Sequence, residues 1–284
     1  MRSTCVRYRL LIPALFLAFS TVAQDRLGPI NALVEQLAAA GTDAVRDSLN
    51  TVLKQDLKAL LEHDDAPTMP LDGLKLSSVD APDHTVRLIT WNVPRENGTH
   101  LYEGLLLHVN GRERDLFELR DMTGEINAPE VPELGPDRWY GALYYQLVPV
   151  KRGAKTYYTL LGWKGHDKVE TRKVIDVLHF KGSQPRFGAP IFGSGKLKKN
   201  RQVFGYSFQA SMMLRYDQGY GIVMDHLAPV RQDLQGQWAF YGPDMSYDAY
   251  VWDKDHWRLE RDIDARDRQR SDKPFNTPPP PPRP

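Results

Sequence analysis

The stretch with the clearest chemical potential runs from Phe240 to Tyr250 and reads FYGPDMSYDAY. It interleaves the carboxylates of Asp244 and Asp248 with three tyrosines, Tyr247 among them, around a Gly-Pro bend. Aromatic rings beside carboxylates are typical of sites for sugars and other polyols. The alternative is a structural turn, in which both carboxylates accept hydrogen bonds from backbone amides while the tyrosines pack. We favour the structural turn and keep Asp244, Tyr247 and Asp248 as candidate ligand-binding residues.

His226 is the fourth candidate ligand-binding residue. Ser207, Asp225 and His226 could be drawn as a catalytic triad, but Asp225 and His226 are neighbours in a strand pattern and so point to opposite faces. Two carboxylates whose separation is about 5 to 10 Å could also hydrolyse a glycosidic bond, although sequence spacing does not fix that separation. We therefore assign no catalytic residue.

Other kinds of catalytic and cofactor chemistry are not supported by the sequence. Gly195-Lys196 is followed by Leu197, where a phosphate-binding loop needs Ser or Thr. The eight histidines show no metal-ligand spacing such as HExxH. We expect no cofactor and no metal site.

The first 23 residues have the pattern of an export signal. Arg2, Arg7 and Arg9 form a basic start, Leu10 to Phe19 an apolar core, and Thr21-Val22-Ala23 a small-residue cleavage site before Gln24. The apolar core is shorter than the roughly 20 residues that a transmembrane helix needs. We expect cleavage after Ala23 and an exported protein, periplasmic or extracellular, without a transmembrane segment.

The cysteine and charge content narrows the class further. The single cysteine, Cys5, precedes the apolar core, whereas a lipoprotein needs its cysteine at the cleavage point, so we do not expect a lipid anchor. Without the signal the chain would have no cysteine, and hence neither a disulfide nor a thiolate nucleophile. Removing three arginines leaves 34 basic against 36 acidic residues, a balance that does not favour nucleic acid.

Two helices are predicted directly after the signal, within residues 24–65. Apolar residues at helical spacing place the first between Pro29 and Ala40, with Pro29 in its first turn and Gly41 as the stop. Thr42 is a suitable N-cap for a second helix from Asp43 to Glu62. The sequence indicates a helical hairpin that packs on the rest of the protein.

Residues 66–263 are predicted to form a β-rich domain. Its centre is an antiparallel meander between Arg138 and Phe180, whose third run carries bulky residues on both faces and so indicates a sheet covered on both sides. Asn97-Gly98 and Asn110-Gly111 supply the positive φ angles of tight hairpin turns, and Thr123 to Pro136 is predicted to be a surface loop. The other strands are expected at 84–93, 99–109, 112–119, 202–208, 211–216, 220–226, 237–241, 249–252 and 257–261.

The fold class is therefore mainly β, in an antiparallel meander, with an N-terminal helical hairpin. Strand clusters of this spacing suit a sandwich, a barrel or a small propeller, and periodicity does not choose among them. Residues 264–284 are charged and then proline-rich, ending TPPPPPRP. We expect a disordered, extended polyproline-like tail in solvent there, with a recognition ligand as the alternative.

Five segments resemble an uncharacterised family of exported proteins from Bacteroidota. They are YYTLLGW, KVIDVLHF, MLRYD, IVMDHLAP and FYGPDMSYDAY, and they occur in this order within residues 138–263. The resemblance implies bacterial export and transfers no functional residue, because we know of no activity, ligand or fold established for that family.

The sequence favours a non-enzymatic protein, either a binding protein or a structural protein associated with the cell envelope. This hypothesis depends on the absence of a metal, phosphate or nucleophile pattern stronger than its structural explanation. A glycan or an envelope protein is the expected kind of partner. The alternative is a hydrolase that acts on an envelope glycan or peptide and uses Asp244, Asp248 or His226.

Overall fold

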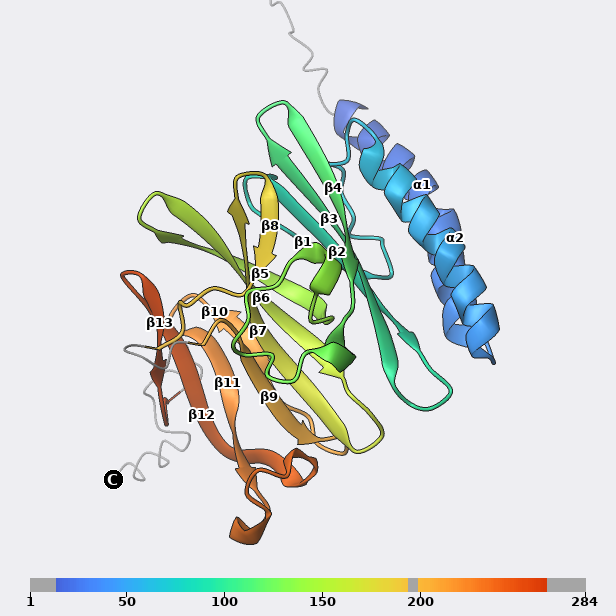
Figure 1. Ribbon diagram of the computed structural model, residues 1–284. Coiled ribbons are helices and arrows are strands. Elements are labelled where there is room, and N and C mark those ends of the chain that lie inside the picture. The colour runs from blue at the N-terminus through green and yellow to red at the C-terminus, as the bar shows by residue number, and fades with distance from the viewer. Residues whose placement is uncertain (1–13, 194–198, 265–284) are drawn as a thin grey trace, which may run out of the picture.

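The computed structural model describes residues 14–193 and 199–264. These residues form a helical hairpin and three antiparallel sheets stacked in chain order (Figure 1). The hairpin covers the outer face of the first sheet, and the middle sheet lies between the first and the last. The predicted class, mainly β with an N-terminal helical hairpin, is confirmed. The open sheets pack face to face, so the arrangement is closest to a sandwich with an additional layer.

The helical hairpin consists of α1 (Ala14–Ala39) and α2 (Asp43–Glu62). The Thr42 side chain accepts a hydrogen bond from the Val45 amide, as expected for an N-cap. The first helix starts well before the predicted position, and Pro29 lies inside it instead of in its first turn. Apolar periodicity locates the part of a helix that carries a buried stripe, but it does not fix the residue at which the helix begins.

A buried polar contact fixes how the hairpin sits on the first sheet. Leu53 and Leu57 of α2 are fully buried against that sheet. Beside them, the Asn50 amide donates to a carboxylate oxygen of Glu103 at 2.9 Å and its oxygen accepts from the Trp91 indole at 2.7 Å. Because an unpaired buried amide is costly, this contact selects one register of helix on sheet. The sheet consists of β1 (Ser77–Asp80), β2 (Val86–Pro94), β3 (His100–Asn110) and β4 (Glu113–Arg120).

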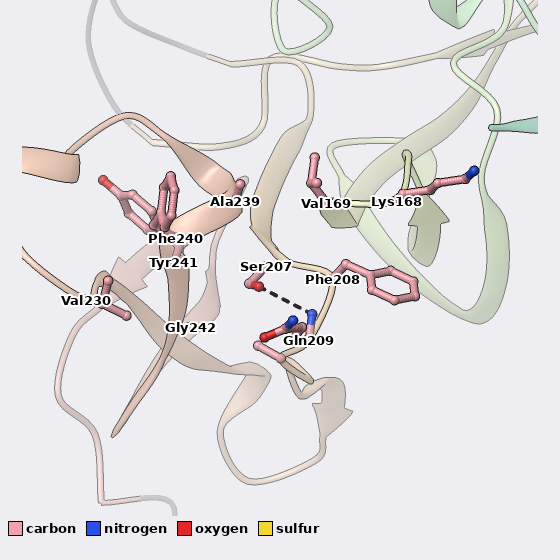
Figure 2. Close-up of a pocket in the computed structure, with 11 residues that line it drawn as sticks. Lys168, Val169, Ser207, Phe208, Gln209, Val230, Ala239, Phe240, Tyr241 and Gly242 are labelled. Carbon is pink, nitrogen blue, oxygen red and sulfur yellow. Dashed lines mark hydrogen bonds between the residues drawn. The ribbon is translucent and has the colours of Figure 1, made fainter. Parts of the chain in front are cut away.

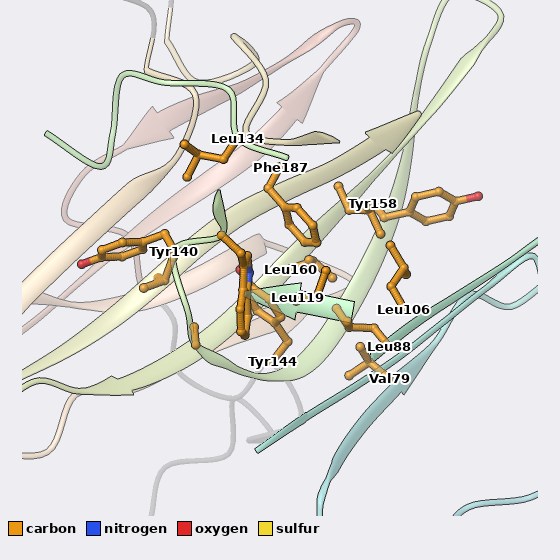
Figure 3. Packing of buried hydrophobic residues seen from close by; sticks show 14 of the residues in the cluster. Val79, Leu88, Leu106, Leu119, Leu134, Tyr140, Tyr144, Tyr158, Leu160 and Phe187 are labelled. Carbon is orange, nitrogen blue, oxygen red and sulfur yellow. The ribbon is translucent and has the colours of Figure 1, made fainter. Parts of the chain in front are cut away.

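The middle sheet contains the predicted meander. Its strand order is β5-β6-β7-β8, and β9 also pairs with β7. Six successive residues of β7, 174–179, are buried, since one face of the strand packs on the first sheet and the other on the last. Figure 3 shows the core between the first and the middle sheet. The prediction of a sheet covered on both sides is confirmed. The strands are β5 (Leu143–Arg152), β6 (Lys155–Gly165), β7 (Glu170–Lys181), β8 (Gln184–Phe187) and β9 (Gln202–Ser207).

The predicted surface loop between the first two sheets is partly buried. It contains two short 3-10 helices, η1 (Thr123–Glu125) and η2 (Pro136–Arg138), and it inserts Ile126 and Leu134 into the core between the sheets. The prediction that this stretch lies on the surface is therefore wrong for these two side chains. Two isolated apolar residues among Pro, Glu and Gly carry no periodicity that would reveal their burial.

A fully buried ion pair ties this loop to the middle sheet. The Arg201 Nε lies 3.1 Å from a carboxylate oxygen of Asp176, and both side chains are completely buried. The Arg201 guanidinium also donates to the carbonyls of Pro129, Pro132 and Phe187. Asp176 in turn accepts a hydrogen bond from the Tyr144 hydroxyl at 3.0 Å. One side chain thus joins three segments of the chain.

The last sheet has the order β10-β11-β12-β13. Two predictions were wrong in this part of the chain. The predicted strand 237–241 is mostly the 3-10 helix η4 (Trp238–Phe240), and a second, η3 (Gln232–Leu234), precedes it. The predicted bend after Phe240 is part of a continuous strand with Met245 at a φ of 72°. The strands are β10 (Leu214–Asp217), β11 (Gly221–Pro229), β12 (Tyr241–Asp253) and β13 (His256–Glu260).

Two segments that the sequence singled out fall outside the described residues. These are most of the predicted signal, residues 1–13, and all but the first residue of the proline-rich tail, residues 265–284. Neither helix of the described part is long and apolar enough to cross a membrane.

Candidate functional site

The structure brings three of the four predicted site residues together on neighbouring strands. The His226 Nδ1 atom lies 2.9 Å from a carboxylate oxygen of Asp248, and its Nε2 atom lies 3.9 Å from one of Asp244. His226 belongs to β11, and both carboxylates belong to β12. The register between the strands shifts at His226, so the two carboxylates flank one ring.

Asp244 braces the irregular part of β12. One of its oxygens accepts hydrogen bonds from the Ser246 amide at 3.1 Å and the Ser246 hydroxyl at 2.8 Å, across the left-handed Met245. Partial burial favours the neutral acid, but the bonds from Ser246 and the charge of His226 outweigh it and lower the pKa of Asp244. The carboxylate is therefore held ionised beside the imidazole.

Asp248 and Tyr247 hold the segment that follows β13. The second carboxylate oxygen of Asp248 accepts a hydrogen bond from the Asp262 amide at 3.2 Å, and the Tyr247 carbonyl accepts one from the Ile263 amide at 2.8 Å. Tyr247 contributes its backbone here. Both oxygens of Asp248 are thus used, one for His226 and one for the chain crossing over the strand.

The triad of Ser207, Asp225 and His226 is not assembled. The Ser207 hydroxyl accepts a hydrogen bond from the Gln209 amide, and the Asp225 carboxylate accepts one from the Met213 amide at 2.7 Å. His226 pairs with Asp248 instead. The cluster of His226, Asp244 and Asp248 therefore contains an imidazole and two carboxylates. Ser207, the nucleophile that such a triad would need, is hydrogen-bonded to Gln209 instead.

Substitution of Asp244 and Asp248 distinguishes a role in bracing the strand from a role in binding or catalysis. If they brace the strand, Asp244→Asn and Asp248→Asn should each lower the free energy of unfolding by about 1 kcal/mol, because an amide keeps only part of the hydrogen bonding. Urea denaturation measures this loss, with the exposed Asp233→Asn as the matched control. Unchanged stability together with loss of binding to a glycan array would contradict the bracing role.

A largely apolar pocket lies beside this cluster in the fold and is lined by other residues. It has a volume of about 500 Å³ and is open to solvent (Figure 2). Four segments converge on it: the β6–β7 connection, the chain after β9, the end of β11, and η4 with the start of β12. The apolar side chains among its lining residues are unusually exposed, namely Val169 59%, Phe208 60%, Val230 72% and Phe240 44%.

The pocket has a rigid backbone frame. The Val230 amide donates to the Phe240 carbonyl at 3.0 Å, and the Phe208 amide donates to the Val169 carbonyl at 3.0 Å. These bonds join the four segments in pairs, so the exposed side chains stand on fixed main chain. Sequence reasoning missed this pocket because its residues are distant in the sequence; the available signal was apolar residues in connections between strands.

The middle sheet also holds a buried cation. The Lys164 side chain is 1% exposed and its ammonium lies 4.2 Å from the centre of the Tyr102 ring and 4.5 Å from that of Tyr140. It donates to the Thr123 hydroxyl at 2.8 Å and to the Gly141 carbonyl. Burial lowers the pKa of Lys164 to about 7, against the opposing charge of Asp121.

The described residues contain no group of three or more His, Cys, Asp or Glu side chains arranged to hold a metal ion. Comparisons with models of protein families, with curated proteins and with solved structures found no match. What can be inferred about function therefore comes from the site itself.

Proposed function

We propose that this is an exported, non-enzymatic binding protein whose site is the apolar pocket after β9. The supporting observation is the gathering of four exposed apolar side chains around a cavity of about 500 Å³. Such a volume is within the usual range for ligand sites, and apolar lining on a fixed frame is what small-molecule and side-chain pockets share. Single exposed apolar residues are common, but a contiguous group around a cavity marks a site of interaction.

The lining indicates the kind of ligand. Phe208 and Phe240 offer aromatic contact, and Val169 and Val230 offer aliphatic contact. The side-chain polar groups among the lining residues are those of Lys168, Ser207, Gln209 and Tyr241. An aromatic or aliphatic group of a small ligand or of an envelope protein suits this surface better than a glycan, because sugars need several polar partners.

Removing one of the aromatic side chains should weaken binding without unfolding the protein. We expect the parent protein to bind the probe 8-anilinonaphthalene-1-sulfonate saturably, and we expect Phe208→Ser and Phe240→Ser each to weaken this binding about tenfold, as the loss of one buried ring implies. Fluorescence titration measures the effect. Val45→Ser, at a position of α2 that is 49% exposed, is the matched control. Equal binding by all four proteins would contradict this site.

A hydrolase remains the second candidate because His226 and Asp248 form a close contact of 2.9 Å. Such a pair can take up and return a proton, and Asp244 on the other ring nitrogen would stabilise the charged ring. A turnover assay on envelope glycans and peptides, run with the Asn variants described above, tests this candidate. Activity that Asp248→Asn removes would replace the binding function as our conclusion.

Export is a further part of the proposal. Cleavage after Ala23 would leave every described member of the core between the hairpin and the first sheet in the mature protein, since these begin at Leu27. We expect the recovered protein to begin at Gln24 and to fractionate outside the cytoplasm. N-terminal sequencing of both fractions tests this, with Ala23→Phe as the variant that should stay uncleaved. An intact Met1 on most of the parent protein would contradict it.

A further inference from the structure

A second groove, independent of the apolar pocket, lies at the turn between β10 and β11. Its volume is about 390 Å³, and four aromatic residues contribute to its lining: Tyr216, Tyr220, Trp252 and Trp257. Pro149 and Lys151 of β5 form part of another wall. The groove thus combines strands of the last sheet with one of the middle sheet.

The two tryptophans form a fixed platform. Their ring centres are 5.2 Å apart at an interplanar angle of 69°, which is an edge-to-face pair. The Trp257 indole donates to the Thr159 hydroxyl at 3.0 Å and the side chain is 1% exposed, so it anchors the pair in the core. Trp252 is only partly buried and presents its ring to the groove.

The described chain ends at the rim of this groove. The Tyr220 hydroxyl, which belongs to a groove residue, donates to the carbonyl of Asp264 at 2.7 Å. The Ile263 amide is bonded to the Tyr247 carbonyl. The position from which the remaining chain departs is therefore fixed, and the side chain of Tyr220 links it to the groove.

The remaining chain has a matching sequence. Residues 277–284 read TPPPPPRP, preceded by Asn276, and the five consecutive prolines 278–282 favour a polyproline II helix. Grooves lined with Tyr and Trp recognise such helices, because the rigid proline rings stack on flat aromatic rings at little entropic cost. We propose that the proline run of the tail docks in the groove beside Trp252 of its own chain.

The length of the intervening chain allows this docking at a small entropic cost. The stretch 265–276 between the rim and the proline run can span at most about 40 Å, which is ample for a return to a groove at its own starting point. A tether of this length gives an effective concentration of roughly millimolar. A polyproline site too weak to capture a free peptide is therefore filled by the attached one.

Photo-crosslinking in the full chain tests the proposal. With p-benzoylphenylalanine in place of Pro280, irradiation should link the tail to residues 216–221 or 251–257, and mass spectrometry locates the link. Trp252→Ser should reduce the yield at least fivefold, whereas Trp238→Ser, at an exposed position outside this groove, should leave it unchanged. Links elsewhere, or a yield insensitive to Trp252, would overturn the proposal.

Two further measurements distinguish the other outcomes. Mixing chains of normal and heavy isotope content shows whether links join one chain or two, and links between two chains would place the tail on a second copy and overturn docking within the chain. Replacing the five prolines 278–282 with serine changes none of the described residues, so fluorine spectra of 5-fluorotryptophan-labelled protein should then shift at Trp252. An unchanged Trp252 signal would also overturn the proposal.

Discussion

Arg201→Met is expected to lower the free energy of unfolding by roughly 3–5 kcal/mol. The change leaves Asp176 as an uncompensated charge that is 0% exposed, and it frees the carbonyls of Pro129, Pro132 and Phe187 that the guanidinium now satisfies. Urea denaturation followed by tryptophan fluorescence measures the loss. We expect the loop that carries Ile126 and Leu134 to come away from the core with it.

The control is the exposed pair of Arg215 and Asp217, whose nitrogen and oxygen lie 2.9 Å apart. Arg215→Met should cost less than about 1 kcal/mol, because solvent screens an ion pair at the surface. The double variant Asp176→Asn with Arg201→Met should be more stable than Arg201→Met alone, since it removes the orphan charge. If Arg201→Met cost no more than Arg215→Met, the buried pair would not be what holds the loop.

Lys164 should make the stability of the protein rise with pH above neutrality. Its pKa is about 7 in the fold against 10.5 for an ordinary lysine, so between these values the unfolded chain binds a proton that the folded chain does not. Raising the pH from 7 to 9 should therefore add roughly 2 kcal/mol to the free energy of unfolding. Below pH 7 both states are charged and the full cost of burying the ammonium applies.

Lys164→Met removes this dependence. Urea denaturation at pH 6, 7, 8 and 9 should give a much flatter profile for the variant, while Lys151→Met, at an exposed position of β5, should retain the parent slope. A contribution from Lys173, whose pKa burial also lowers, is present in all three proteins and cancels in the comparison. If Lys164→Met kept the parent's dependence of the free energy of unfolding on pH, deprotonation of Lys164 would not be the cause of that dependence.

The strands were predictable where local chemistry decides them. Gly98 and Gly111 have φ angles of 86° and 63°, as the two Asn-Gly turns require, and the strands around them lie within a few residues of their predicted bounds. The prediction failed at Phe240 to Tyr250, because Gly-Pro indicates a bend unless a neighbouring strand continues the ladder. Here β11 pairs with both ends of that stretch.

The candidate site was predictable only in part. Asp244, Asp248 and His226 lie together because two strands pair across an irregular register, which the sequence does not show. The pocket of Phe208 and Phe240 depends on contacts between segments far apart in the chain. Sequence patterns describe neighbours along an element, so a site formed by four connections gives no local signal.

The stacking of the layers in chain order has a consequence for the growing polypeptide. When the first sheet and the middle sheet are synthesised, a layer that covers one of their faces has already been made, because the hairpin precedes the first sheet and that sheet precedes the middle one. The middle sheet differs: until residues beyond 207 are synthesised, its second face, with Leu161, Ile175 and Val177, lacks the cover that the last sheet provides. A chain interrupted at that point would present a wide apolar sheet, which is the kind of surface that chaperones bind and that otherwise aggregates.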